Sequence, residues 1–217
     1  APVYLGIGAK QTSKALTGAK DVEVNVFDGP CPAGNVGVQV NNIAPVNKGE
    51  GVWTVDPTAV IFFGRLFRTG KVDLRRLVAV AGSEITKPEY AEVLVGQPMA
   101  DLLEGKLAAK DHVRIINGNP LTGRKATMDD FVGGHTSEIT VIPEGDNVDE
   151  MLGWILPRTN DFSVSRSYFS WLFGKNKEYA LDARVKGGER HMIMSGEYDK
   201  VLPMDIYAEY LIKAIIA

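Results

Sequence analysis

Apolar and polar positions alternate along the start of the chain in the manner of strands joined by a helix. "PVYLGIG" (residues 2–8) and "VEVNVF" (residues 22–27) are short runs rich in β-branched residues, which favours strands. The segment between them, "AKQTSKALTGAK", predicts a helix that ends near a glycine. "VGVQVNNIAPV" (residues 36–46) spaces its valines two apart and predicts extended backbone.

The next segment, "DPTAVIFFGRLFRTG", predicts a helix with Asp56 as its N-cap, Pro57 at its first position and Gly70 just beyond its end. Its apolar residues are so dense that we expect most of its circumference to be buried: Val60, Ile61, Phe63, Leu66 and Phe67. "RLVAVAG" (residues 76–82) is a continuous apolar run, typical of a strand buried within a sheet. The first third is therefore predicted to be α/β.

The pattern changes near Gly82. Strands are predicted over residues 90–96, 112–118 and 137–145, with one short helix between Pro98 and Gly105. This order predicts a small α+β unit whose helix packs on one face of a sheet. Beyond Phe162 we expect a strand leading into a helix, then two strand-like runs around Gly187 and Gly188. A last helix is predicted from Pro203 onward.

The segment "SRSYFSWLFG" gathers more aromatic side chains than one face of a short element can hold. They either fill a core or form an exposed apolar patch. We expect at least one of Tyr168, Phe169 and Trp171 to face a partner.

Composition narrows the function classes. The 217 residues carry a net charge of −3, which gives no electrostatic reason to expect nucleic acid as a partner. No apolar run approaches the roughly 18 residues of a membrane helix, so we expect no transmembrane segment. Cys31 is the only cysteine, which excludes an internal disulfide within these residues. Both ends interrupt predicted elements, so we expect a piece of a longer protein.

Motifs for catalysis or metal binding are missing from these residues. There is no G-x-S-x-G, no H-E-x-x-H and no P-loop, and His112, His135 and His191 lie far apart in sequence. We therefore expect neither catalytic residues nor metal ligands, and interpret the histidines as surface or packing residues.

The stretch "GPCPAGNVGVQV" (residues 29–40) is the one candidate cofactor site. Gly34 and Gly37 follow a predicted strand, as glycines of a phosphate-binding loop do. The middle glycine of G-x-G-x-x-G is missing, and we expect no strong helix start directly after the loop. A structural turn is therefore favoured, with cofactor contact by Gly34 and Gly37 as the alternative.

Several segments, in this order, resemble the A subunits of sodium-translocating NADH:quinone reductases. They include "PAGNVGV", "VIFFGRLFRTG", "VAVAGSEITKPE", "RIINGNPLTG", "EMLGWILPRTNDFSVSR" and "VKGGERHMIMSGEYDKVLPMDI". The resemblance implies a partial Rossmann-like domain over residues 1–82. It further implies a soluble-ligand-binding β-grasp (SLBB) domain with an extension over residues 83–202, and the start of a C-terminal helical domain over residues 203–217.

The same resemblance implies a peripheral subunit on the cytoplasmic face of a bacterial inner membrane. Its partners would be the other subunits of a complex that uses NADH, flavins and ubiquinone and exports sodium. Wider relatives of the family carry a glycine-rich flavin loop and clustered cysteines, and this chain has neither. We therefore expect a fragment that helps to organise the complex, that is not catalytic by itself and that binds no cofactor. Contact with ubiquinone is left open. Alternatives are a flavin- or NADH-binding enzyme domain and a β-grasp module for another small ligand, such as a cobalamin or saccharide.

Overall fold

The computed structural model describes residues 1–30, 32–146, 152, 155–163, 166–173, 177–184 and 192–216. Contacts divide the chain into two compact units, one formed by Ala1–Asp56 with Glu189–Ala217 and the other by Pro57–Gly188. Within the described ranges, none of the helices combines the length and apolar character needed to cross a membrane.

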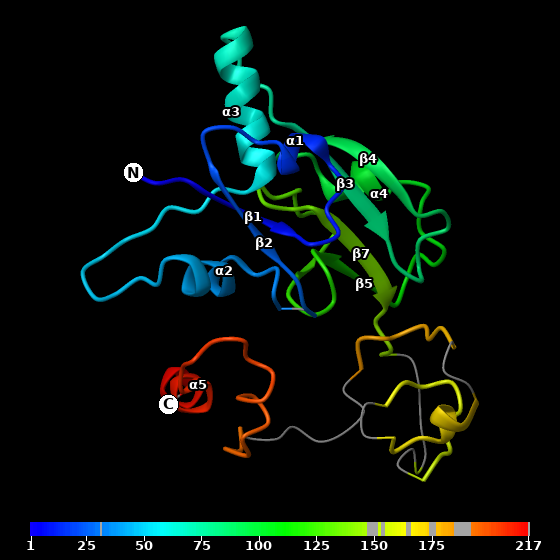
Figure 1. Cartoon of the computed structure of the whole chain (residues 1–217). Helices are drawn as coiled ribbons and strands as arrows, with labels where there is room; N and C mark the ends of the chain where they lie inside the picture. Colours follow the sequence, from blue (N-terminus) through cyan, green and yellow to red (C-terminus); the bar gives the residue numbers. More distant parts are fainter. Residues whose placement is uncertain are drawn as a thin grey trace. The chain divides into compact units, whose positions relative to one another are not determined.

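The first unit begins with a strand–helix–strand arrangement (Figure 1). Strand β1 (Tyr4–Gly8) pairs in parallel with β2 (Glu23–Phe27), with Gly8 opposite Phe27. Helix α1 (Lys14–Thr17) lies in the connection and ends at Gly18, whose N–H donates to the Lys14 carbonyl. Parallel strands need such a crossover, so the predicted order of elements is confirmed, although α1 is shorter than predicted.

The extended backbone predicted for residues 36–46 is wrong, because Val36–Ile43 form helix α2. Asn35 is its extended N-cap residue, and Val38 is buried. The side chain of Gln39 lies against Gly6 of β1, where an added Cβ would come within 2.2 Å of the Gln39 Oε1 atom. The valine spacing of this segment favours a strand, but the segment is a helix and makes this tertiary contact. The last helix, α5 (Ala208–Ile216), also begins later than the predicted Pro203.

The second unit begins with α3 (Pro57–Thr69), whose predicted ends are confirmed. Gly70 follows it with a φ of +68°, the conformation expected of a glycine that ends a helix. The predicted burial of α3 is wrong, since none of its residues is buried. Phe67 is 86% exposed.

A five-stranded sheet forms the centre of the second unit (Figure 1). Its strands, in spatial order, are β4 (Glu89–Leu94), β3 (Arg75–Ala81), β7 (Glu138–Pro143), β5 (Val113–Asn117) and β6 (Arg124–Ala126). The two central strands, β3 and β7, are parallel, and the other neighbours are antiparallel.

The core of this unit lies between one face of the sheet and helix α4 (Met99–Leu103). Val78 and Val80 of β3 are fully buried, whereas Leu77 beside them is 66% exposed. The expected strand buried within a sheet is confirmed for β3, although its Leu77 is exposed, and the expected helix on one sheet face is also confirmed. Because the sheet includes β3, it begins before Gly82, where the pattern of the sequence changes. The domain boundaries at residues 82 and 202 stay predictions.

Residues 169–173 form a short 3-10 helix, Phe169–Phe173. Residues 162, 163 and 166–168 contain no strand, contrary to the expectation for this segment. The strand-like runs expected around Gly187 and Gly188 lie partly in residues 185–191, outside the described residues.

Candidate functional site

The loop between β2 and α2 lies at the carboxyl end of a parallel strand pair. Ligands of α/β sheets bind beyond this edge, because the loops that follow parallel strands meet there. Two turns order the loop: the Ala33 N–H donates to the Pro30 carbonyl at 2.9 Å, and the Asn35 N–H donates to the Pro32 carbonyl at 2.8 Å. Cys31 lies outside the described residues.

Gly34 and Gly37 are both exposed at this loop, with Gly37 in the first turn of α2. Neither has a positive φ, and a Cβ added to either would meet nothing within 4 Å. Neither backbone conformation nor packing within the described residues therefore requires glycine here. Contact of the two glycines with a cofactor stays a prediction.

The start of α2 supplies a feature that the sequence did not indicate. The first N–H groups of a helix have no partner within the helix, and the helix dipole favours an anion beside them. The expected absence of a helix start after this loop is wrong, because α2 begins directly at Val36. The loop still lacks the middle glycine of the dinucleotide-binding motif, so the motif remains incomplete.

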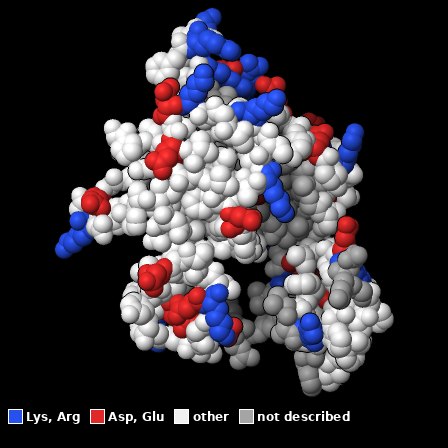
Figure 2. Space-filling model, in the orientation of Figure 1, with Lys and Arg blue, Asp and Glu red and all other residues white. Residues whose placement is uncertain are grey.

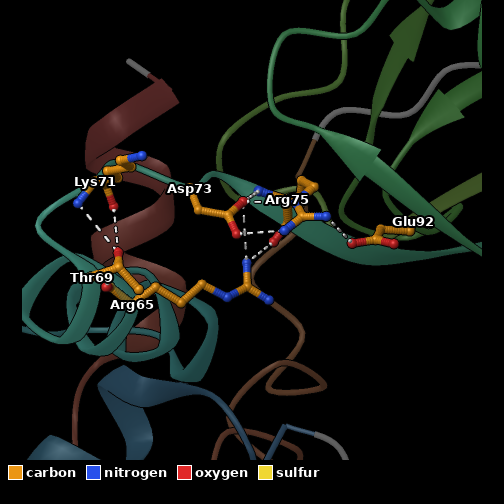
Figure 3. Close-up of polar contacts among 6 residues, drawn as sticks. All are labelled: Arg65, Thr69, Lys71, Asp73, Arg75 and Glu92. Carbon is orange, nitrogen blue, oxygen red and sulfur yellow. Dashed lines mark hydrogen bonds and ion pairs between the residues drawn. The ribbon is translucent and has the colours of Figure 1, made fainter.

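A charged network joins the end of α3 to the start of β3 (Figure 3). Asp73 accepts two hydrogen bonds from the Arg75 guanidinium, at 3.0 and 2.9 Å, and lies 3.8 Å from Arg65. Arg65 also donates to the Arg75 carbonyl, and Arg75 lies 3.7 Å from Glu92 on β4. Hydrogen bonds from Arg75 lower the pKa of Asp73 from 3.8 to about 2, so this carboxylate stays ionised at neutral pH.

A second charged network joins β5 and β6 to Glu144, which directly follows β7. Arg114 on β5 donates to both carboxylate oxygens of Glu144, at 2.9 and 2.6 Å, and Lys125 donates to one of them at 3.1 Å. The Arg114 hydrogen bonds are the main reason that the pKa of Glu144 falls from 4.5 to about 2. A general acid or base needs a pKa near the working pH, so both networks are suited to holding strands rather than to proton transfer.

The Glu144 network predicts acid sensitivity. Its pKa is lowered in the folded state, so its stabilisation is complete above about pH 4.5 and disappears as pH falls toward 2. At pH 7 we expect Glu144→Gln to reduce the free energy of unfolding by about 1–2 kcal/mol, and this difference to vanish at low pH. Urea titrations between pH 2 and 7 measure both effects. Glu92→Gln, at an exposed pair, should cost less than about 0.5 kcal/mol, and equal losses in the two variants would contradict the prediction.

Histidines and acidic residues form no cluster of three or more metal-binding groups in the described part of the chain. His112 is exposed, and its Nδ1 lies 2.8 Å from the Asp146 Oδ1. His135 is also exposed, while His191 lies outside the described residues. The positions of His112 and His135 agree with the surface interpretation.

The aromatic segment lies partly at the surface. Phe169 and Trp171 are exposed, and Tyr168 is half-buried with the Arg158 guanidinium 5.5 Å from its ring centre. Tyr168, Phe162 and Leu181 line a shallow hollow of about 220 Å³. Exposure of two of the three rings is what a partner contact needs; the contact itself stays a prediction.

Two family models match the chain in order. The model described as "NqrA second alpha/beta domain" matches residues 1–72, and the model described as "NQRA C-terminal domain", an SLBB model, matches residues 77–128. The chain is thus of the class that joins an α/β domain to an SLBB domain, in agreement with the mixed α/β structure.

Curated relatives match almost the whole chain. The NqrA protein of the Na⁺-translocating NADH-quinone reductase from Neisseria meningitidis serogroup C is 36% identical over 199 residues, which are 91% of this chain and 44% of the relative. The corresponding protein from Vibrio atlanticus is 34% identical over 209 residues, 96% of this chain and 46% of the relative. The chain therefore belongs to the NqrA family, and it spans a little under half the length of these relatives.

Proposed function

We propose that this chain is part of the NqrA component of a Na⁺-translocating NADH:quinone reductase and organises a peripheral portion of that complex. The in-order match to two NqrA domain models and to relatives across 91% or more of the chain carries the proposal. In this proposal the complex oxidises NADH, reduces ubiquinone and exports sodium at the bacterial inner membrane. This chain lies on the cytoplasmic face, bound to the other subunits.

The finer fold assignment is part of the same proposal. Residues 1–82 would be a partial Rossmann-like domain, supported by the parallel β1–β2 pair and its crossover. Residues 83–202 would contain the β-grasp fold, supported by a hairpin, a helix and a final strand parallel to β3 at the sheet centre. Residues 203–217 would begin the helical domain, supported by α5.

Reconstitution tests the organisational role. We expect a complex lacking NqrA to lose quinone reduction and sodium transport, and full-length NqrA to restore both. The purified chain should show no NADH:quinone turnover alone. Turnover by the isolated chain, or an unimpaired complex without NqrA, would overturn the proposal.

Ubiquinone contact is a separable part of the proposal. Calorimetry of the purified chain with ubiquinone-1 tests it, with heat of binding expected if these residues contribute to the contact. Absence of binding to both the chain and full-length NqrA would remove quinone contact and leave the organisational role.

A second candidate is a flavin- or NADH-binding domain. The observation that favours it is the start of α2 directly after the loop that holds Gly34, with Gly37 in the first turn of the helix. Gly37→Asp would place a carboxylate beside the helix N–H groups and is expected to abolish phosphate-dependent binding, whereas Gly51→Asp, in open space outside this loop, should not. A purified chain without flavin absorbance and without response to NADH would exclude this candidate.

A further inference from the structure

The turn that follows β5 begins with an asparagine–glycine pair, Asn117–Gly118. It is the only such pair in the 217 residues. An asparagine loses its side-chain amide most readily when glycine follows it, because glycine has no side chain to hinder attack by its own backbone nitrogen. The pair therefore carries a chemical reactivity that the proposed function does not use.

The fold requires both residues of the pair. Gly118 has a φ of +110°, and a Cβ there would lie 2.9 Å from the Gly123 Cα atom across the turn. Asn117 ends β5, and its Oδ1 accepts a hydrogen bond from the Thr136 hydroxyl at 2.6 Å. Thr136 is 6% exposed, so loss of the Asn117 acceptor would leave its buried hydroxyl without this partner. Replacing either residue of the pair is therefore expected to destabilise the turn.

The same contacts hold the pair in an unreactive arrangement. Loss of the amide begins when the Gly118 nitrogen attacks the Asn117 side chain, but this N–H donates to the Glu138 carbonyl at 2.9 Å. The Gly118 carbonyl accepts from the Thr140 hydroxyl at 2.8 Å, and Thr136 fixes the Asn117 side chain. These three partners lie on β7 or just before it, so the attack requires β5 to part locally from β7. All five residues belong to the second unit, so the arrangement does not depend on the first.

We propose that Asn117 is a deamidation site that the fold both creates and shields, and that it reacts only when β5 opens from β7. In the open state the Gly118 nitrogen bonds to the Asn117 Cγ atom, the bond from Cγ to the side-chain nitrogen breaks, and that nitrogen leaves as ammonia with the Gly118 proton. Water then opens the cyclic imide at either carbonyl and leaves aspartate or isoaspartate. Isoaspartate lengthens the backbone, so residue 117 loses its register with Arg124 and Ile139. The modification thus records an opening event and weakens this side of the sheet.

Peptide mapping by mass spectrometry tests the proposal on purified chain held in mildly alkaline buffer, with and without urea. We expect residue 117 to convert about 100-fold or more slowly in the folded chain than in urea, because the reaction follows the open fraction. Thr136→Val and Thr140→Val each remove one hydroxyl bond to the pair and should speed conversion in the folded chain about 5-fold. Neither variant should change the rate in urea, since both positions are remote in sequence from the pair.

Thr86→Val is the matched control, because its hydroxyl donates to the Lys106 carbonyl at 3.0 Å rather than to the pair. It should leave the rate at residue 117 unchanged within about 2-fold, and circular dichroism should show all variants folded. Equal acceleration by Thr86→Val and Thr136→Val would show that only global unfolding exposes the pair, and would overturn the local shield. Equal conversion in the folded and the unfolded chain would overturn it as well.

Salt separates this shield from the charged networks. Figure 2 shows Lys and Arg side chains gathered where α3 ends, whereas the side chains bonded to the pair among the described residues are the uncharged Thr136 and Thr140. We therefore expect about 1 M salt, which screens exposed ion pairs, to leave conversion of the folded chain unchanged. A rate that rises with salt would show that ion pairs, and not these hydroxyl bonds, keep the pair closed.

Discussion

Gly82→Ala is expected to reduce the free energy of unfolding of the second unit by about 3–5 kcal/mol. Gly82 directly follows β3 and has a φ of +123°, a conformation that L side chains rarely adopt. A Cβ there would lie 2.0 Å from the Val141 carbonyl oxygen and 2.6 Å from its nitrogen. Both atoms are backbone of β7, so the clash cannot be relieved by rotating a side chain, and the parallel pairing of β3 with β7 must shift.

Substitutions at two other glycines serve as controls that separate the cost of backbone strain from the cost of the steric clash. Gly96 has a φ of +88° but open space around it, so Gly96→Ala should cost about 1 kcal/mol. Gly134 has neither a positive φ nor a close neighbour, so Gly134→Ala should have almost no effect. Urea denaturation followed by far-ultraviolet circular dichroism gives the three values. A cost for Gly82→Ala no larger than that for Gly96→Ala would show that β3 and β7 are not packed as described.

Local sequence signals predicted the elements that have local causes. Helix α3 begins at Pro57 and ends before Gly70, because a proline at the first position and a glycine after the last turn act within a few residues. Helix α4 begins directly after Pro98, its N-cap residue, and Gly105 with a positive φ follows soon after its end. Strand β7 was also predicted, since its β-branched run lies between turn residues.

Predictions failed where long-range contacts decide the outcome. Helix α2 has the valine spacing of a strand, but its Gln39 packs on Gly6, far earlier in the sequence. The density of apolar residues in α3 predicted burial, because sequence composition cannot tell a core-facing helix from one that offers an apolar face to another surface.

In the candidate site, too, features with local causes could be predicted from the sequence and features that depend on long-range contacts could not. The pattern of glycines after a strand identified the loop of Gly34 and Gly37, but only the structure shows that a helix begins there. The pairing of Asp73 with Arg75 could have been predicted from their spacing of two residues. The pairing of Arg114 with Glu144 could not, because the register of β5 and β7 brings these residues together across 30 positions.

Leu103→Ala is expected to cost about 2–5 kcal/mol of unfolding free energy. Leu103 ends α4, is 1% exposed and belongs to the cluster that joins this helix to β3 and β7. Removing its branched end leaves a cavity between the helix and the sheet, and the short helix has few other contacts with which to close it. Leu121→Ala is the matched control: the same atoms are removed from a side chain that is 91% exposed, so the loss should stay within about 0.5 kcal/mol. Urea denaturation of both variants measures the difference, and similar losses would contradict the placement of α4 over the sheet core.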